Sequence, residues 1–363
     1  MADTAPERVQ EVLLSGYIGQ GPQVEAFEAA FGQLVDTPFP PLALNSCTSA
    51  LDLALHLIGV GPGDEVISTP MTCTASNGVI VNRGAKIVWA DVDPFTGLIS
   101  PADVGRKITP QTKAIMAVDW GGRPCDYPAL KAFGLPVIED AAHALCATLG
   151  GESIARAGGD YVCWSFQAIK HLTTGDGGAL LTPEETLERG RLLRWYGLDR
   201  RSDESFRCKQ KIREAGFKYH MNDIAAAIGL ANLRLAQENV ELGRRNAAYY
   251  ERELFGIEEP DRESAWWLYT LIVQERDAFI RDMRERGIEA SPVHARNDRQ
   301  PAFRFRSGPL PGVDYFSARE VAIPVGWWLS EGEREWIAGE VKDWIERQSS
   351  PAPLSALSGS ETR

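Results

Sequence analysis

Short apolar runs alternate with stretches of helical spacing through the first half of the chain. The apolar runs cover residues 42–44, 65–68, 86–90, 114–118, 135–140, 161–166 and 179–182. The helical stretches between them cover residues 50–57, 74–81, 101–106 and 126–133. Strands and helices that alternate at this spacing predict an α/β fold, with a mostly parallel sheet covered by helices on both faces. Ligands of such sheets bind beyond the carboxyl ends of the strands.

The second half of the chain predicts a smaller unit. A long helix is expected from Asn222 to about Phe255, and the composition changes near residues 256–264. A strand at 267–273 and helices at 277–286 and 331–346 then indicate a C-terminal α+β domain. Residues 1–255 are assigned to the N-terminal segment and the large domain, and 256–348 to the small domain. Residues 349–363 are rich in Ser, Pro and Ala and are expected to be a disordered tail.

Lys170 has an unusual place in this pattern. It lies between the apolar runs at 161–166 and 179–182, and the glycine-rich turn 173–178 follows it. Glycines there let a ligand or another backbone segment approach closely. A lysine that loses its solvent in such a turn has a lowered pKa and becomes a nucleophile that can form a Schiff base. The alternative is an ordinary loop lysine, which is the usual case for a single lysine taken alone.

Polar residues also follow two neighbouring apolar runs. Asp140 ends the run at 135–140, His143 lies three residues further on, and Ser165 lies near the end of the run at 161–166. Each has a structural explanation as well. Asp140 and His143 fit a turn at the end of a strand, and Ser165 fits a buried hydroxyl bonded to the backbone.

The turn at 45–49 connects the first apolar run with a helix. Backbone N–H groups at a helix N-terminus and the helix dipole attract anions, and the hydroxyls of Thr48 and Ser49 would add two donors. A simple N-cap by Ser46 or Thr48 explains the same residues.

The order and spacing of these motifs, from about Leu14 to about Lys342, resemble the DegT/StrS family of sugar aminotransferases. Members of that family bind pyridoxal 5′-phosphate (PLP) and have the fold-type-I architecture. The resemblance implies that the catalytic residues are Lys170, which carries the cofactor and moves a proton, and Asp140, which keeps the pyridine nitrogen protonated. It places His143 near the phenolic oxygen of the cofactor. The phosphate is expected on Thr48, Ser49 and Ser165.

The chain departs from the family pattern at two positions. Cys73 stands where the family usually has an aromatic residue that stacks on the pyridine ring. Such a stack is worth about 0.5–1.5 kcal/mol, so its loss would weaken cofactor binding modestly. Lys218 stands where an asparagine normally reaches the cofactor phosphate of the partner subunit, and a lysine is an equally suitable ligand. The resemblance therefore implies a homodimer with shared active sites.

Charge narrows the choice of partners. The formal net charge of −12 argues against nucleic acid. Residues 191–218 nevertheless hold nine basic residues against four acids. This stretch is either a solvated helical face with its loop or a rim that attracts the phosphates of the cofactor and a nucleotide-diphosphate substrate. His294, Arg296 and Arg299 could face substrate, but surface or structural use is the preferred interpretation for each.

Cysteine usage and hydropathy indicate a cytoplasmic protein. The six cysteines are scattered, with no CxxC pair and no zinc-like spacing, so reduced thiols and no metal site are expected. The apolar runs are too short for a membrane span, and residues 1–7 have neither the basic segment nor the apolar core of a signal peptide. Neither a membrane nor a nucleic acid is an expected partner.

The leading hypothesis is a PLP-dependent aminotransferase that moves an amino group, with glutamate the expected donor, to a nucleotide-linked keto-sugar. Amination of a free keto-cyclitol is the second enzymatic hypothesis. A PLP-binding regulator without turnover is a third, and the presence of Asp140, His143 and Lys170 together disfavours it. Dehydratases of the family often lack the lysine, so Lys170 argues against dehydration. No GxGxxG follows the first strand, which disfavours a dinucleotide-binding dehydrogenase.

Overall fold

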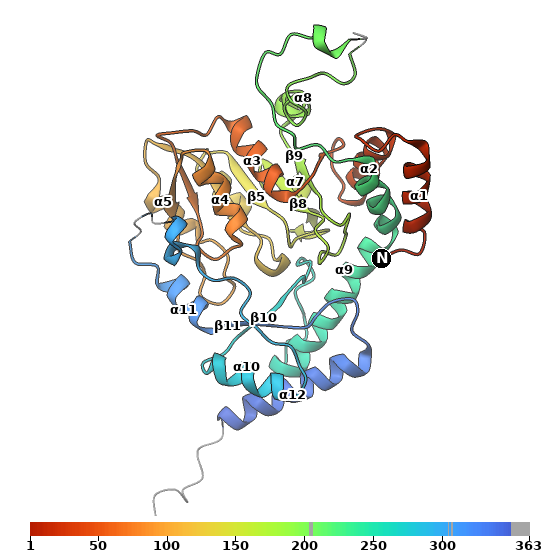
Figure 1. Ribbon diagram of the computed structural model, residues 1–363. Coiled ribbons are helices and arrows are strands. Elements are labelled where there is room, and N and C mark those ends of the chain that lie inside the picture. The colour runs from red at the N-terminus through yellow and green to blue at the C-terminus, as the bar shows by residue number, and fades with distance from the viewer. Residues whose placement is uncertain (203–205, 304, 306–307, 350–363) are drawn as a thin grey trace, which may run out of the picture.

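A seven-stranded sheet forms the centre of the larger part of the molecule (Figure 1). The computed structural model describes residues 1–202, 206–303, 305 and 308–349. Within these residues the strand order is β1-β9-β8-β5-β4-β2-β3. The strands are β1 (Leu42–Leu44), β2 (Glu65–Ser68), β3 (Lys86–Trp89), β4 (Thr112–Val118), β5 (Val137–Asp140), β8 (Tyr161–Ser165) and β9 (Gly178–Leu181). β9 is antiparallel to both of its neighbours, and the other neighbouring pairs are parallel. The prediction of a mostly parallel sheet is confirmed.

Side chains of the strands alternate between two buried layers. On β5, Ile138 packs in the layer that contains α3 (Cys47–Ile58), whereas Val137 packs on the opposite side with α6 (Tyr127–Lys131). Further along that opposite side, Phe27 of α2 (Pro22–Leu34) packs edge-on against Phe166, with ring centroids 5.3 Å apart. The remaining helices of this part are α1 (Ala5–Ser15), α4 (Thr74–Asn82), α5 (Pro101–Lys107), α7 (Ile154–Ala157) and α8 (Glu184–Leu193). Helices therefore cover both faces, as predicted.

A second core lies beneath the sheet in the view of Figure 1. The antiparallel pair β10 (Tyr269–Ile272) and β11 (Glu320–Ile323) packs in it with α10 (Arg276–Glu285) and α12 (Glu331–Ser349). The long helix α9 (Asp223–Phe255) spans both cores, because Ala226 packs with the sheet and Tyr250 with the second core. The other elements are α11 (Pro311–Arg319), β6 (Thr148–Leu149), β7 (Glu152–Ser153) and the 3-10 helices η1 (Trp120–Gly122), η2 (Arg207–Lys209), η3 (Asn297–Arg299) and η4 (Pro301–Phe303).

Two local boundaries differ from the sequence-based expectation. α3 begins at Cys47, three residues before the apolar stretch, because the hydroxyl of Ser46 caps it by accepting a hydrogen bond from Ser49 N at 3.1 Å. The strand expected at 267–273 is shorter, because the backbone at Trp266 has φ +49° and turns before β10 starts at Tyr269. Trp267 is thereby left outside the sheet, which matters for the site described below.

The division into two units stays a prediction, although the second core already includes Ala247 and Tyr250, on the N-terminal side of the proposed boundary at 255/256. The tail expected from 349 lies outside the described residues from 350 onward. None of the helices in the described ranges combines the length and the apolar composition that a transmembrane span requires.

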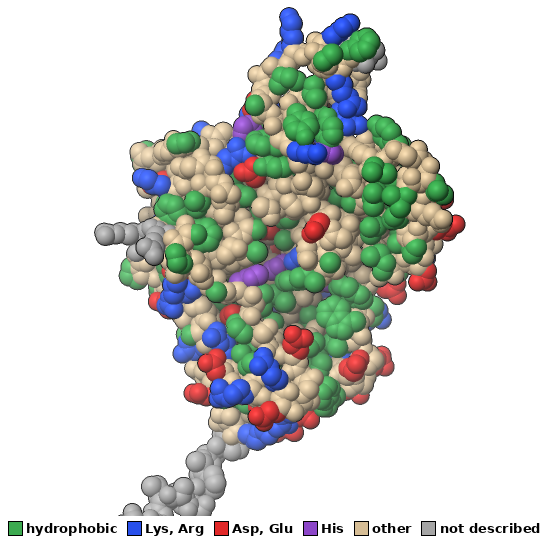
Figure 2. Space-filling view, viewed as in Figure 1, with side chains coloured by type: hydrophobic (Ala, Val, Ile, Leu, Met, Phe, Trp, Pro, Cys, Tyr) green, Lys and Arg blue, Asp and Glu red, His purple; other side chains and the backbone are tan. Residues whose placement is uncertain are grey.

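The chain between α8 and α9 leaves the body of the molecule at the top of Figure 1. The described part of this arm, residues 195–202 and 206–216, carries exposed apolar side chains on Tyr196, Phe206 and Ile212. Lysines and arginines are grouped over it in Figure 2. The basic stretch found in the sequence therefore belongs largely to an arm that extends from the body.

Candidate active site

A cavity of about 330 Å³ opens at the carboxyl ends of β5 and β8. The N-termini of α3 and α4 form one side of it, and the segments around Trp267 and His294 form the other. Figure 2 shows a hollow in the middle of the molecule with histidine side chains along it. This is the edge of the sheet at which the strand order predicts a ligand. The structure brings Thr48, Cys73, Asp140, His143, Ser165 and Lys170 together there.

Asp140 lies at the inner end of the cavity and is almost fully buried. Its Oδ2 accepts a hydrogen bond from the hydroxyl of Ser76 at 2.6 Å, and its Oδ1 accepts one from Ala142 N at 3.2 Å. Burial raises the pKa of the carboxyl group, while these two hydrogen bonds and the charge of Lys170 act in the opposite direction. A positively charged group bound next to Asp140 would favour the carboxylate further.

Lys170 lies on the opposite side of the cavity and is partly buried. Loss of solvent lowers the pKa of its ammonium group to about 8, although the negative charge of Asp140 favours the charged form. Its Nζ lies 3.5 Å from the centroid of the Trp267 ring. A lysine with a pKa this close to neutral exchanges its proton readily, which suits a nucleophile or a general base.

His143 forms part of an aromatic stack along the cavity wall. Its ring lies parallel to that of Trp267, with centroids 3.9 Å apart, and His294 continues the stack at 6.1 Å. Burial lowers the pKa of His143 well below its usual value and that of His294 to about 4, so both rings are neutral near pH 7. The buried Nδ1 of His143 has no hydrogen-bond partner among the described residues. It is a polar atom that a bound ligand could satisfy.

The N-terminus of α3 forms the end of the cavity that suits a phosphate. Thr48 is exposed at the first turn of the helix, whereas the hydroxyl of Ser49 is buried and donates to Asn45 Oδ1 at 2.6 Å. Thr48 is therefore the better hydroxyl donor, and Ser49 contributes mainly through its position at the helix start. A Cβ at Gly178 would meet Cys47 N at 2.4 Å, so only glycine allows β9 to pass this close to the helix. The glycine-rich turn thus serves the approach of two backbone segments.

Ser165 and Cys73 complete the predicted set inside the cavity. Ser165 ends β8 with a partly buried side chain, and its hydroxyl accepts a hydrogen bond from Gln167 N at 3.4 Å. Cys73 is exposed just before α4, close enough to Lys170 to interact with it electrostatically. The thiol has no ring, so this wall offers a ligand no aromatic surface at position 73.

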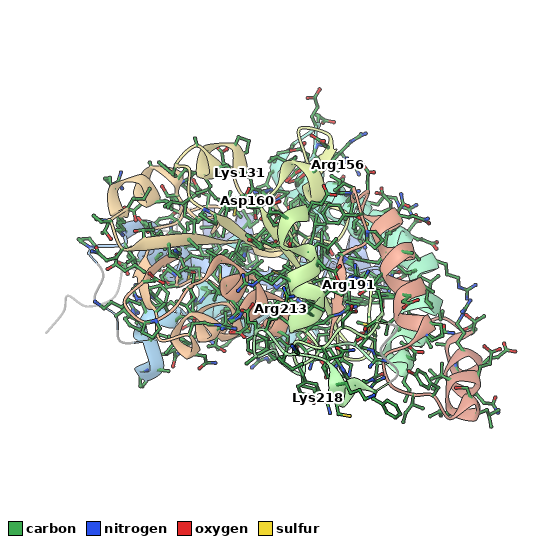
Figure 3. The ribbon with its side chains drawn as sticks, turned by 90° about the horizontal axis from the view of Figure 1, so that it is seen from above. Lys131, Arg156, Asp160, Arg191, Arg213 and Lys218 are labelled. Atoms are coloured by element: carbon green, nitrogen blue, oxygen red, sulfur yellow. The ribbon has the colours of Figure 1, made fainter. Side chains whose placement is uncertain are left out.

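Lys218 is exposed, and the residues that line the cavity in this chain do not include it. Its carbonyl oxygen accepts a hydrogen bond from Asn45 Nδ2 at 3.2 Å, which fixes its backbone beside the start of α3. In Figure 3 Lys218 lies at the edge of the molecule. Lys218 is therefore exposed to solvent in a single chain, outside the cavity.

Of the three residues that could face substrate, the structure places one in the cavity and two in ion pairs outside it. His294 lines the cavity. Arg296 lies in a bidentate pair with Asp298, with Nε and Nη2 at 2.8 and 2.7 Å, and also pairs with Asp314. Arg299 is exposed and lies 3.5 Å from the same Asp314 carboxylate. These ion pairs agree with the surface or structural use preferred for both arginines.

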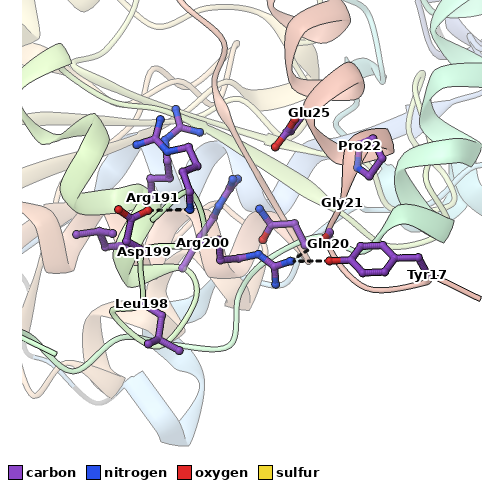
Figure 4. A pocket seen from close by; sticks show the side chains of 12 residues that line it. Tyr17, Gln20, Gly21, Pro22, Glu25, Arg191, Leu198, Asp199 and Arg200 are labelled. Carbon is purple, nitrogen blue, oxygen red and sulfur yellow. Dashed lines mark hydrogen bonds between the residues drawn. The ribbon is translucent and has the colours of Figure 1, made fainter. Parts of the chain in front are cut away.

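Arg191, Arg194 and Arg201, at the start of the basic stretch, pair with neighbouring acids. A pocket of about 430 Å³ between the start of α2 and the arm is lined by Tyr17, Gln20, Gly21, Pro22, Glu25, Arg191, Leu192, Arg194, Leu198, Asp199, Arg200 and Arg201 (Figure 4). Arg194 pairs with the buried Glu28, and Arg201 pairs with Glu188. Arg200 donates to the carbonyl of Gln20 at 2.7 Å. These contacts favour a structural role for the arginines of this pocket.

Three further residues contact the catalytic pair and were not singled out in the sequence; one is Cys47, whose thiol donates to Asp140 Oδ1 at 3.8 Å. Ser76 binds the Asp140 carboxylate from the first turn of α4, and Trp267 covers Lys170. A serine inside a helix carries no signal of such a contact. The Trp266–Trp267 pair beside the composition change was a weak signal that aromatic surface would be used there.

The polar groups of the cavity match the functional groups of PLP. A carboxylate stands at one end, helix N-terminal N–H groups and Thr48 stand at another, and the amine of Lys170 lies at the side. The cavity volume is at the lower end of the range for small-molecule sites. The unpartnered Nδ1 of His143 gives an independent sign that a polar ligand belongs here. No group of three or more His, Cys, Asp or Glu within the described residues could hold a metal ion.

The sequence matches the DegT/DnrJ/EryC1/StrS aminotransferase family over residues 1–342. The crystal structure of AtS13 from Actinomadura melliaura superposes with a TM-score of 0.89 at 42% identity, covering 94% of this chain and 96% of that one. The dTDP-4-dehydro-2,3,6-trideoxy-D-glucose 4-aminotransferase of Saccharopolyspora spinosa is 32% identical over 371 residues, covering 96% of each chain. Spr1654 from Streptococcus pneumoniae, solved in a PMP-form, is 27% identical with a TM-score of 0.86 and 96% coverage of each chain.

Proposed function

Because the chain belongs to the DegT/DnrJ/EryC1/StrS aminotransferase family and is a PLP-dependent aminotransferase, we propose that it transfers an amino group from glutamate to a nucleotide-linked keto-sugar. The observation that carries the site assignment is the cavity in which the buried carboxylate of Asp140 and the amine of Lys170 face the same space. When bound, PLP supplies the electron sink for cleavage of the bond to the substrate α-hydrogen.

Lys170 is proposed to bind the cofactor covalently and then to move the substrate proton. Its Nζ, with a pKa of about 8, can accept a proton from the substrate carbon and return it near neutral pH. One lysine can perform both tasks, because its side chain lines the cavity in which the cofactor and the substrate would meet.

Asp140 is proposed to stabilise the positive charge of the pyridine nitrogen. The hydrogen bonds from Ser76 and Ala142 N hold the carboxylate in one orientation before any ligand arrives. A preorganised charge of this kind stabilises the transition state without reorganisation during the reaction. His143, neutral and with Nδ1 unpartnered, is proposed to bond the phenolic oxygen.

Phosphate binding is proposed to involve both subunits of a homodimer. Within one subunit, Thr48, the backbone at Ser49 and the hydroxyl of Ser165 lie around the start of α3. Lys218 is exposed beside that same helix start, while the basic arm projects away from the body (Figure 1). These positions support a lysine that completes the site of the partner.

Mixing two variants tests this arrangement. If Lys218 acts in trans, hybrid dimers of Lys170→Ala with Lys218→Ala contain one site that has both lysines and one that has neither. Activity should then rise above that of either variant alone. Confirmed hybrid dimers without recovery, together with normal PLP binding by Lys218→Ala, would contradict a role across the interface.

The acceptor class rests on the relatives. The Saccharopolyspora spinosa relative is named for a dTDP-linked dehydro-sugar, which supports a nucleotide-linked acceptor here. A free keto-cyclitol remains the second candidate among acceptors. The half-reaction distinguishes them: the enzyme is first converted with glutamate, and the return of the original cofactor absorbance is then followed with each acceptor.

Nucleotide-linked keto-sugars should restore the absorbance, and free keto-cyclitols should not. If only a keto-cyclitol restores the absorbance, the acceptor is a cyclitol and the assignment of a nucleotide-linked sugar is wrong. If glutamate does not convert the enzyme, glutamate is not the amino donor. Alanine and glutamine would then be tested in its place.

A further inference from the structure

The indole of Trp267 contacts both the catalytic lysine and the backbone that carries it. The Nζ of Lys170 lies over the ring, 3.5 Å from its centroid. The Nε1–H of the same indole donates to the carbonyl oxygen of Ile169 at 3.0 Å. The other neighbour of the ring is His143, stacked at 3.9 Å with an interplanar angle of 24°. One side chain therefore fixes the segment before Lys170 and also meets the lysine's charged end.

The backbone around Trp267 is held in an uncommon conformation. Trp266 has φ +49°, which bulky residues rarely adopt. Its indole donates to the carbonyl of Asp261 at 2.9 Å and is buried in the second core. Leu268 N donates to Gly121 O at 3.2 Å on the far side of the turn. Trp266 thus anchors the turn while Trp267 faces the cavity.

We propose that the face of Trp267 is the resting site of the Lys170 ammonium whenever Nζ is not bonded to the cofactor. The proposal rests on the role of Lys170 in the proposed function. Each transamination cycle releases the lysine, and a free lysine side chain has many rotamers. A cation over an indole is attracted by the negative face of the ring, most strongly where water is partly excluded. Trp267 would keep the released amine within reach of the reacting carbon.

The other titratable groups around Lys170 do not hold its ammonium group in place of the Trp267 ring. The titratable groups that interact with the lysine come from several elements: Cys47, Cys73, Asp140, His143, His171 and His294. Burial lowers the pKa of His171 to about 3 and that of His294 to about 4, so these imidazoles do not compete as cations. Asp140 attracts Lys170, but the two side chains form no ion pair within the described residues. The indole is the surface that Nζ contacts.

Replacing Trp267 by a small residue would not give a clear answer. Loss of the ring removes the attraction for the cation, which lowers the pKa of Lys170, but it also admits water, which raises it. Fluorinated tryptophan separates the two effects, because fluorine weakens the negative face of the ring and leaves its size and its N–H in place.

The experiment uses cofactor-free protein in which tryptophan is replaced throughout by 4-fluorotryptophan or 5-fluorotryptophan. Trace labelling with acetic anhydride over a pH series, followed by peptide mapping, gives the pH midpoint at which Lys170 becomes reactive. The midpoint should fall by about 0.2–0.5 pH unit in the fluorinated wild-type chain. The matched control is Trp267→Phe, whose midpoint fluorination should leave unchanged. Fluorination is confirmed by mass spectrometry and the fold by circular dichroism.

An unchanged midpoint in the fluorinated wild-type chain overturns the proposal. An equal fall in the Trp267→Phe chain also overturns it, because another tryptophan would then be responsible. The labelling needs neither cofactor nor turnover. If borohydride trapping instead places PLP on a different lysine, the proposed function fails at that point, and the labelling result still reports whether Trp267 holds Lys170.

Discussion

Glu139 and Asp140 are consecutive acids on β5, both buried, yet they face opposite layers of the sheet. Asp140 faces the cavity, where Ser76 and a backbone N–H bind it and Lys170 provides a positive charge. Glu139 faces the other layer, where it accepts a hydrogen bond from Gly159 N at 2.6 Å and lies beside Asp119, another buried acid. A buried carboxyl group is thus no sign of function by itself. The cavity and the nearby cation distinguish the catalytic acid from the structural one.

Asp119 and Glu139 form a buried pair of acids on the side of the sheet opposite the cavity. Asp119 Oδ1 accepts hydrogen bonds from the hydroxyl of Tyr127 at 2.6 Å and from Cys125 N at 3.0 Å. Asp119 Oδ2 and Glu139 Oε1 are buried without another partner among the described residues. Burial and mutual repulsion raise the pKa of Glu139 well above its usual value and burial raises that of Asp119 to about 6, so one proton between the two satisfies both oxygens.

Removal of Lys170 should have the largest effect on the reaction rate. Lys170 provides the positive charge beside Asp140, and among the described residues Glu139 has no such neighbour in the cavity. Lys170→Ala should lower the glutamate half-reaction by about 10³–10⁴-fold or more, since both cofactor attachment and proton transfer are lost. The rate is followed by the absorbance of the bound cofactor. Borohydride trapping and peptide mapping of the wild-type enzyme should place the adduct on Lys170. An adduct on another lysine, or a variant rate within tenfold of wild type, would contradict the assignment.

The two neighbouring acids should differ sharply in the same assay. Asp140→Asn should retain the cofactor and slow the half-reaction by about 10²–10³-fold, because a neutral amide cannot keep the ring nitrogen charged. Glu139→Gln makes the same chemical change one residue earlier and should leave the rate within about threefold. Similar rates for the two variants would mean that the face of β5 does not decide the role of its acids.

The free energy of unfolding should depend on pH through Asp119 and Glu139, the buried acids on the face of the sheet opposite the cavity. In the unfolded chain Asp119 and Glu139 ionise near their usual values of 3.8 and 4.5, whereas in the folded chain their pKa values are raised. Their contribution is therefore complete below about pH 4 and is lost as the pH rises through the folded values. Urea unfolding from pH 4 to 8 should show Glu139→Gln gaining about 1–3 kcal/mol over wild type across this range. Glu335→Gln, an exposed acid on α12, should follow wild type.

Much of this arrangement could be predicted from local sequence. The alternation of strands and helices predicted the mostly parallel sheet, and the carboxyl ends of parallel strands necessarily bring Asp140 and Ser165 to one edge. Lys170 and the start of α3 join them there because β9 runs back against the N-terminus of that helix. The roles of these residues came from the family resemblance, and the structure does not test them individually.

The rest depends on contacts between distant segments. Ser76 and Asp140 are 64 residues apart, and Trp267 and Ile169 are 98 apart, so no local pattern could pair them. The position of Trp267 also depends on the positive φ of Trp266, which no residue preference predicts for a tryptophan. Asp119 and Glu139 escaped notice for a related reason, because a shared proton leaves no sequence signature.

The smallest effects should come from the hydroxyl donors on the two sides of β5. Ser76 Oγ and Tyr127 Oη each donate to a buried carboxyl group at 2.6 Å, the first to Asp140 and the second to Asp119. Ser76→Ala removes a donor that orients Asp140 toward its ligand, and it should slow the half-reaction by about 5–10-fold with little change in the free energy of unfolding. Tyr127→Phe leaves Asp119 with one donor fewer in a fully buried site, and it should lower the free energy of unfolding by about 1–2 kcal/mol.

Ser76→Ala should therefore change mainly the reaction rate, and Tyr127→Phe mainly the free energy of unfolding. Tyr127→Phe should keep the half-reaction within about twofold of wild type, because Tyr127 contacts the side chain of Asp119, whereas Asp119 reaches Asp140 through a backbone hydrogen bond, N to O at 3.2 Å, that the variant retains. Thr72 Oγ1, at 2.8 Å from Ser76 Oγ, remains in the Ser76→Ala variant and can partly replace the lost donor, which keeps the expected kinetic effect small. Rates and urea midpoints are measured on the same preparations. A slowed half-reaction in Tyr127→Phe would show that the hydrogen bonds of Asp119 influence Asp140 through β5, and the separation of the two faces would then fail.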